Sequence, residues 1–402
     1  MSTLKLSSRL ANVKVSATVA IADRAKQLKA EGRDIIALAS GEPDFDTPLN
    51  IRAAAHRALD SGETHYTMAE GIVELRQAVC NKLKRDSGLH YAPDQVIVSA
   101  GGKQVIFNAM MATLERGDEV IIPAPYWVSY PDIVRLFGGK PVIVQTEESS
   151  GFLMSPSQLE SAISENTRWV FLNSPSNPSG AVYQPSDLQA IGEVLMKHPQ
   201  VWVMTDDIYE KIVYDDIDIA SFAEAVPSMQ PRTLVVNGLS KSHAMTGWRL
   251  GYGASSVELT AAMRKIQGQS TMHPCSIAQW AGVEALDGPQ EFLAGMLESF
   301  SKRRDQTMAA LDAIDGIHCF PPQGAFYLFI SVKDQLNKSS AAGTRLLSDA
   351  DWVMALMEEQ GVSVVPGSAF GTEGYFRLSF ATDEKSLEVA CKRIAQFCEG
   401  VN

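Results

Sequence analysis

Cysteine is scarce in this sequence, and the cysteines that are present are scattered. The chain has 402 residues and 5 cysteines, and no two of them have the close spacing of a metal-binding motif. An odd number at such spacings suggests neither a zinc site nor a disulfide framework. We therefore expect free thiols, no bound metal and a cytoplasmic protein. The five residues are Cys80, Cys275, Cys319, Cys391 and Cys398.

Clustered positive charge and long apolar runs are also missing. The net charge is −12 and no Lys/Arg-rich block occurs, which argues against nucleic acid or an anionic membrane as a partner. No apolar run reaches the roughly 18 residues of a membrane span. The N-terminal segment carries Lys5, Arg9 and Lys14 before its first acid, as a transit peptide does. An N-terminal arm that packs on the body of the protein is the favoured interpretation.

Two nucleotide-binding signatures are absent as well. A GxGxxG motif after the first strand, which a nicotinamide dehydrogenase requires, is not found. The run Gly101-Gly102-Lys103 lacks the GxxxxGK[ST] spacing of a P-loop. These absences argue against both classes.

What the sequence does contain is an alternation of short β-rich runs with longer helical patterns. This alternation is typical of βαβ units, so we predict an α/β fold with a mostly parallel central sheet in a large domain, plus a smaller α+β domain. We expect residues 1–49 to form the N-terminal arm and part of the small domain, 50–288 the large domain, and 289–402 the C-terminal small domain. The strands predicted for the large domain are 95–99, 119–123, 141–145, 168–173, 201–205, 233–237 and 249–253. The small domain should hold a long helix over 290–314, strands at 326–331, 362–365 and 375–380, and a closing helix from Asp383.

Polar groups follow several of these strands. Gly101 and Gly102 come after the first, Asp206 ends another with Tyr209 three residues on, and Lys241 follows a third. Each of these features is common on its own, because glycine pairs often form turns, aspartates at strand ends often cap helices, and most lysines lie on the protein surface. Open parallel sheets bind ligands beyond the carboxyl ends of their strands. Together these groups therefore predict one site.

The residue types suit one cofactor, pyridoxal phosphate. A lysine with a lowered pKa can form a Schiff base with an aldehyde. An aspartate facing a pyridine nitrogen keeps the ring protonated as an electron sink. A tyrosine hydroxyl can bond the ring oxygen, while an arginine and a glycine-rich helix start can hold a phosphate.

The chain also resembles a known family along most of its length, from about Lys14 to the C-terminus. It is similar to the fold-type I, class I aminotransferases, and most closely to the bacterial aspartate aminotransferases of the thermophile and rhizobial subgroup, some of which also accept prephenate. The motifs that carry the resemblance are SGEPDFDTP (40–48), GGKQ (101–104), PAPYWVSYP (123–131), NSPSNPSG (173–180), TDDIYE (205–210), SKSHAMTGWRLGY (240–252), GAFY (324–327), VVPGSAFG (364–371) and FRLSFA (376–381).

The resemblance implies roles for residues around the cofactor. Lys241 is implied to be the Schiff-base lysine and proton shuttle, and Asp206 the partner of the ring nitrogen. The remaining cofactor ligands implied are Tyr209 and Asn177 at the ring oxygen, Trp127 on the ring face, and Gly101, Gly102, Lys103, Ser240 and Arg249 at the phosphate, with Tyr66 reaching the phosphate from the neighbouring subunit of a homodimer.

It also implies roles in substrate binding. Arg377 is implied to hold the α-carboxylate in a bidentate fork, close to the Gly41 backbone, with Trp127 and Asn177 beside it. Lys103 is implied to hold a distal carboxylate, and Lys14 matches a lysine implicated in prephenate use.

Several alternatives stay open. Trp127 is also consistent with a core aromatic and Tyr209 with a buried structural tyrosine. Met272 and His273 stand where the family has small residues, so they either reshape the distal pocket or pack at the subunit interface. His243 has no assigned role.

The predicted reaction is a ping-pong transamination, aspartate plus 2-oxoglutarate giving oxaloacetate plus glutamate. A prephenate, aromatic or broad-specificity aminotransferase is the alternative, and a pyridoxal phosphate lyase of the same fold is a further one. A cofactor-binding transcriptional regulator would need an additional winged helix before residue 1.

Overall fold

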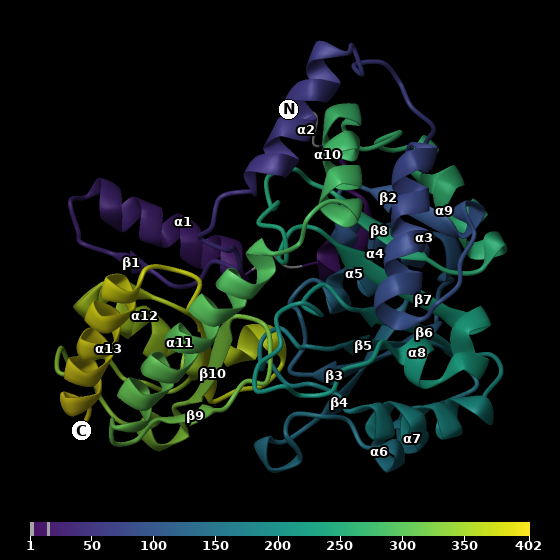
Figure 1. Ribbon diagram of the computed structural model, residues 1–402. Coiled ribbons are helices and arrows are strands. Elements are labelled where there is room, and N and C mark those ends of the chain that lie inside the picture. The colour runs from purple at the N-terminus through teal and green to yellow at the C-terminus, as the bar shows by residue number, and fades with distance from the viewer. Residues whose placement is uncertain (1–3, 14–16) are drawn as a thin grey trace.

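The computed structural model describes residues 4–13 and 17–402. Its two parts lie side by side in Figure 1. A large part built on a seven-stranded sheet occupies the centre and right, and a smaller part in green to yellow lies at the left. The α/β architecture predicted from the sequence is confirmed. Among the described residues, no helix combines the length and apolarity needed to cross a bilayer.

The large sheet has the strand order β2-β8-β7-β6-β5-β3-β4. All neighbouring pairs are parallel except those of β8, which runs antiparallel to both β2 and β7. Every residue of β2 and β7 is buried, as expected where helices cover both faces of a sheet. The strands are β2 (Val96–Ser99), β3 (Glu119–Ala124), β4 (Lys140–Gln145), β5 (Thr167–Asn173), β6 (Trp202–Asp206), β7 (Thr233–Gly238) and β8 (Gly251–Ala254).

Helices pack around this sheet, and α2 and α10 lie side by side at the top of Figure 1. The turn into α4 is tight because Gly101, with φ of 88°, adopts a left-handed conformation between the end of β2 and the helix. The helices of the large part are α2 (Leu49–Asp60), α3 (Val73–Ser87), α4 (Gly102–Thr113), α5 (Tyr130–Leu136), α6 (Pro156–Ala162), α7 (Pro185–Met196), α8 (Phe222–Ala225), α9 (Val257–Gly268) and α10 (Ser276–Asp287).

The smaller part is built on an antiparallel sheet of order β12-β13-β10-β9 and a parallel pair, β1 with β11. Ile36 pairs with Val362, so the N-terminal segment joins the C-terminal part. The domain boundaries themselves stay a prediction. The elements are α1 (Ala17–Ala30), β1 (Ile36–Ala37), α11 (Phe292–Asp312), β9 (His318–Phe320), β10 (Tyr327–Ser331), α12 (Asp349–Gln360), β11 (Val362–Ser363), β12 (Val365–Pro366), β13 (Tyr375–Ser379) and α13 (Glu384–Glu399).

One predicted strand differs in its start. The sequence predicts a strand from Arg249, whereas β8 begins at Gly251. Arg249 has a φ of 54°, a left-handed conformation that does not fit a strand and that turns the chain back towards β2. Because β2 and β7 both run antiparallel to β8, they end at the same edge of the sheet as β5 and β6. That shared edge positions the site.

Candidate active site

A cavity of about 360 Å³ lies at this edge, between the large sheet and the smaller antiparallel sheet. Its size is typical of a small-molecule site. Every site residue predicted from the sequence lines it except Tyr66 and Lys14, and Lys14 lies outside the described residues. The predicted residues in the cavity are Gly41, Gly101, Gly102, Lys103, Trp127, Asn177, Asp206, Tyr209, Ser240, Lys241, Arg249 and Arg377.

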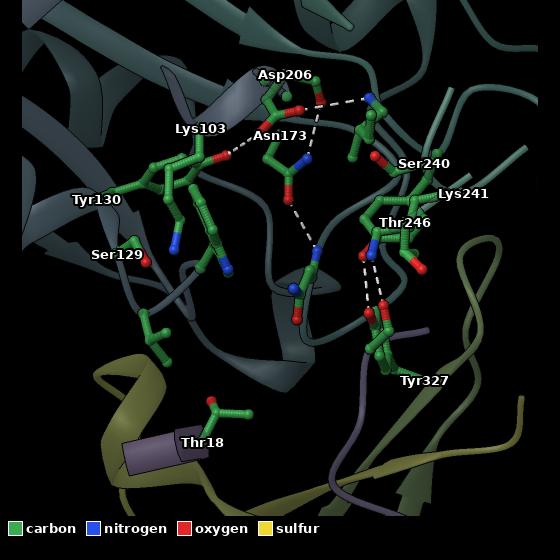
Figure 2. A pocket seen from close by; sticks show the side chains of 18 of the residues that line it. Thr18, Lys103, Ser129, Tyr130, Asn173, Asp206, Ser240, Lys241, Thr246 and Tyr327 are labelled. Atoms are coloured by element: carbon green, nitrogen blue, oxygen red, sulfur yellow. Dashed lines mark hydrogen bonds between the residues drawn. The ribbon is translucent and has the colours of Figure 1, made fainter. Parts of the chain in front are cut away.

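Lys241 lies in the turn that follows β7. Its Nζ donates a hydrogen bond to the Gly41 carbonyl, so the lysine bridges the two parts of the molecule (Figure 2). Burial, together with the positive charges of Arg377 and Arg249, lowers the pKa of Lys241 to about 8 against the opposing effect of nearby acids. A sizeable fraction of the amine is therefore neutral, and hence nucleophilic, near neutral pH.

Asp206 ends β6 and is only 8% exposed. Burial raises its pKa to about 6, against the opposing effects of a 2.7 Å hydrogen bond donated by Tyr130 Oη and of the charge of Lys241. Asn173 at the end of β5 donates to the Asp206 carbonyl at 2.8 Å and accepts from the Asn177 amide at 2.8 Å (Figure 2). Sequence reasoning assigned no role to Tyr130 or Asn173, although both lie within recognised motifs.

Tyr209 follows Asp206 in the next turn, and its hydroxyl lies 2.7 Å from that of Tyr327 on β10. Burial is the main reason that the pKa of Tyr209 is well above its ordinary value. Tyr327 also explains the glycine at position 41, because a Cβ there would lie 2.5 Å from the Tyr327 hydroxyl. Tyr327 belongs to the GAFY motif, but no feature of the sequence indicated its contact with Tyr209.

Arg377 on β13 is 3% exposed and enters the cavity from the opposite side. Its Nη1 donates to Asn177 Oδ1 at 2.8 Å and its Nη2 to the Ala39 carbonyl at 2.7 Å. The guanidinium carbon lies 4.4 Å from the centre of the Tyr327 ring. Its Nε has no hydrogen-bond partner within residues 4–13 and 17–402. A buried, always charged group with a spare donor is suited to a carboxylate.

A cluster of positive groups at the start of α4 forms another wall of the cavity. A Cβ on Gly101 would lie 2.6 Å from Arg249 Nη2, so only glycine leaves room for the guanidinium. The Arg249 guanidinium donates to the carbonyls of Thr246 and Ala100, at 2.9 and 3.3 Å. Amide groups at a helix start together with an arginine form an anion site.

Lys103 sits in the first turn of α4 with its Nζ 4.8 Å from the centre of the Trp127 ring. Burial lowers the pKa of Lys103, and the positive charge of Arg249 lowers it further. Lys103 therefore lies close to both the anion site and the Trp127 ring. This position is compatible with both roles that the sequence suggested, contact with the cofactor phosphate and contact with a distal substrate carboxylate.

These groups fit pyridoxal phosphate. The space that glycine leaves at Arg249 suits the phosphate, the buried Asp206 suits a pyridinium nitrogen, and Lys241 suits the aldehyde. Trp127 lies in the cavity wall and packs edge to face on Tyr130 at 5.3 Å, a position compatible with contact to a cofactor ring.

Tyr66 lies away from the cavity and is 88% exposed. Its loop is nevertheless firmly held. His273 Nε2 accepts a 3.2 Å hydrogen bond from the Thr67 amide and its ring packs edge to face on Tyr66, while Gln279 donates to Thr67 Oγ1. Neither Met272 nor His273 lines the cavity of its own chain, and both alternatives for this pair stay open.

Comparison with known proteins agrees with this geometry. Residues 33–394 match the family described as aminotransferase class I and II. The chain is 53% identical to the aspartate/prephenate aminotransferase of Cereibacter sphaeroides, over 99% of each chain, and 49% identical to an aspartate aminotransferase of Rhizobium meliloti, over 98% of this chain and 96% of that protein. A crystal structure of the aspartate aminotransferase from Rhizobium meliloti superposes with a TM-score of 0.97 at 48% identity, covering 100% of both chains. The aspartate aminotransferase of Thermus thermophilus with maleate gives 0.92 at 39% identity, covering 98% of this chain and 100% of that one.

Proposed function

The chain belongs to the class I and II aminotransferases, and from this premise we propose that its preferred substrate pair is aspartate and 2-oxoglutarate. It is a pyridoxal-phosphate-dependent aminotransferase that moves an amino group between amino acids and 2-oxo acids. The observation that carries the proposed specificity is that, besides Lys241 and the phosphate-site Arg249, the cavity has two separate cationic groups, the buried Arg377 and Lys103 at the start of α4. A dicarboxylic substrate needs two such groups, one for each of its carboxylates.

When bound, the cofactor supplies an aldehyde for covalent capture of the amine and a protonated ring that stabilises negative charge at the substrate Cα. Arg249, Ser240 and the first amides of α4 would hold its phosphate. Asp206 would hold its ring nitrogen, with Tyr130 keeping that carboxylate in place. Tyr209 and Asn177 would bond the ring oxygen.

Lys241 supplies the amine and moves the proton. With a pKa of about 8, its Nζ is neutral often enough to attack a carbonyl and then to take and return the proton at the substrate Cα. The lysine reaches the cavity from the β7 side, where the Gly41 carbonyl accepts a hydrogen bond from its Nζ.

Arg377 would orient the substrate through its α-carboxylate. Asn177 and the Ala39 carbonyl fix the two Nη atoms, so the guanidinium plane is set before the substrate arrives. A lysine could not form the planar fork that a bidentate carboxylate contact requires.

The distal carboxylate would contact Lys103. Relatives that are named aspartate or aspartate/prephenate aminotransferases, and a relative solved with the dicarboxylate maleate, support a dicarboxylic substrate. The names of several relatives also favour prephenate as a second amino acceptor, with Lys14 as the residue to test.

We also propose a homodimer in which the partner subunit's Tyr66 completes each phosphate site. An 88% exposed tyrosine on a loop fixed by His273 and Gln279 is preorganised to insert into a second surface. Nearby exposed apolar side chains, Met68 and Met272, would be covered by the same contact.

Absorbance spectroscopy tests the substrate proposal. Protein purified with its cofactor should absorb in the visible. Aspartate should convert that band to a near-ultraviolet one, and 2-oxoglutarate should reverse the change. A panel of aspartate, glutamate, alanine, phenylalanine and arogenate ranks the donors, and Lys241→Ala serves as the inactive control. Persistence of the band with every donor would refute transamination, whereas conversion by alanine or phenylalanine in preference to aspartate would refute only the dicarboxylic assignment.

Hybrid dimers test the shared site. Subunits carrying Lys241→Ala and subunits carrying Tyr66→Ala are each expected to be poorly active. In a mixed dimer, one site would receive an intact lysine and the partner subunit's Tyr66, so activity should reappear on mixing. Lack of recovery, with mixed dimers shown to form, would place Tyr66 in its own subunit's site or outside both.

A further inference from the structure

A buried ionic cluster lies behind the cavity, outside the residues that line it. It consists of Lys82 and Asp86 from α3 together with Glu210 and Lys211 from the turn after β6, and we refer to it as the α3 cluster. Lys82 is 3% exposed. A lysine that deeply buried is rare unless it is paired.

The pairing in the α3 cluster is specific. Lys82 forms an ion pair with Glu210, and its Nζ lies 3.8 Å from Asp86 Oδ2. Lys211 Nζ lies 2.8 Å from the same Asp86 oxygen. Burial alone would lower the pKa of Lys82, but Glu210, Tyr252 and Asp86 together outweigh burial and the pKa is raised, so the lysine stays charged. Arg85 Nε lies 2.7 Å from the other Asp86 oxygen, so the two carboxylates of Asp86 and Glu210 have three cationic partners.

The cluster is joined directly to the active-site turn. Glu210 is the residue after Tyr209 and four positions after Asp206. Tyr209 lines the active-site cavity, whereas Glu210 lines a small separate cavity of about 20 Å³ together with Lys82. Adjacent side chains of one turn therefore face opposite ways, one towards the ligand and the other towards α3.

The second active-site turn borders the same small cavity. Asn237 at the end of β7 and Ser242 and His243 after Lys241 line it. His243 is held between Ser242 Oγ at 2.8 Å and Gln290 Oε1 at 3.1 Å, and burial lowers its pKa to about 4. A neutral histidine adds no charge to the cluster.

Stability does not explain a buried ion pair of this kind. Desolvation of two charges offsets most of their attraction, and apolar replacements of similar volume are often as stable. A buried ion pair does restrict the positions of its two side chains, because each charge is stable there only when it lies close to its partner. We propose that Lys82 is a positioning residue that holds the Asp206–Tyr209 turn in its catalytic geometry through Glu210. This inference rests on the proposed function.

The test compares Lys82→Met, which keeps the length of the side chain and removes its charge, with Lys82→Arg, which keeps the charge. Arg304→Met is the matched control, since Arg304 is 7% exposed and paired with Asp215 but does not line the active-site cavity. Three quantities are measured on the holoenzymes: the thermal midpoint, the pH titration of the visible cofactor band, and kcat and KM for the amino donor.

We expect Lys82→Met to move the midpoint of the band titration and to lower kcat at least tenfold. KM should change little, because the substrate α-carboxylate is held by Arg377, which lies on another element. Lys82→Arg should restore most of kcat. Arg304→Met should lower the thermal midpoint alone. If Lys82→Met lowers the thermal midpoint while the band titration and kcat stay at wild-type values, the role is structural and the proposal fails.

Glu210→Gln provides a second route if Lys82→Met does not fold, because the amide keeps the shape of the carboxylate. It should reproduce the shifted band titration, and an unshifted titration would overturn the proposal. These readouts depend on the cofactor band and not on which amino acid is preferred. Absence of any visible band in the wild-type protein would instead overturn the proposed function.

Discussion

The hydroxyls of Tyr209 and Tyr327 meet at 2.7 Å, one from the turn after β6 of the large sheet and the other from β10 of the smaller sheet. The Tyr327 ring also lies under the Arg377 guanidinium, at 4.4 Å. One tyrosine therefore contacts both the proposed ligand of the cofactor ring oxygen and the proposed ligand of the substrate carboxylate. This contact couples the two halves of the site.

Tyr327→Phe should separate the two contacts, because it removes the hydroxyl and keeps the ring under Arg377. Loss of one hydrogen bond of about 1 kcal/mol predicts a fall of about fivefold in kcat, since the Tyr209 hydroxyl loses the partner that orients it. KM for the amino donor should change little. Steady-state kinetics on both substrates measures this, with Tyr209→Phe as the reference. A rise in KM at constant kcat would mean that Tyr327 acts through Arg377 instead.

The pH dependence of cofactor capture follows from Lys241. Burial lowers its pKa from the ordinary 10.5 to about 8, and the neutral amine is the reactive form. The rate at which the apoprotein takes up pyridoxal phosphate should therefore rise with pH and level off above about 8. Arg377→Met removes a neighbouring positive charge and should move this midpoint upward. A rate that keeps rising towards pH 10 in the wild type would contradict the lowered pKa.

Most of the fold could be predicted from the sequence because its strands are continuous apolar runs between turn residues. Strands β3 to β7 begin and end within one or two residues of the expected positions. The antiparallel direction of β8 could not be predicted, because the direction of a strand depends on the edge of the sheet at which the chain re-enters it. The proposed cofactor ligands Asp206, Tyr209 and Lys241 could be inferred from the sequence because each ends or follows a strand. Contacts such as that of Tyr327 with Tyr209, or of Lys82 with Glu210, join residues 118 and 128 positions apart and arise only from packing.

Gly101→Ala should weaken cofactor binding for a steric reason. The new Cβ would lie 2.6 Å from Arg249 Nη2 and push the guanidinium away from the phosphate site. Roughly tenfold weaker binding of pyridoxal phosphate to the apoprotein is expected from the loss of one charge-assisted contact. Gly117→Ala is the matched control, since Gly117 also has a positive φ, 100°, but a Cβ there meets no atom within 4 Å among the described residues. Equal weakening in both variants would attribute the effect to backbone strain.

Lys103→Met decides between the two roles that the sequence suggested for this lysine. Its Nζ lies over the Trp127 ring, and its lowered pKa reflects burial and then the charge of Arg249. If Lys103 binds the distal carboxylate, kcat/KM for aspartate should fall about 10- to 100-fold, the effect of one lost charged hydrogen bond, while alanine is unaffected. If it binds the phosphate, both amino acids should lose equally and cofactor affinity should fall with them. Half-reaction kinetics with the two amino acids, read beside the cofactor dissociation constant, separates these outcomes, because only a phosphate ligand moves the second quantity.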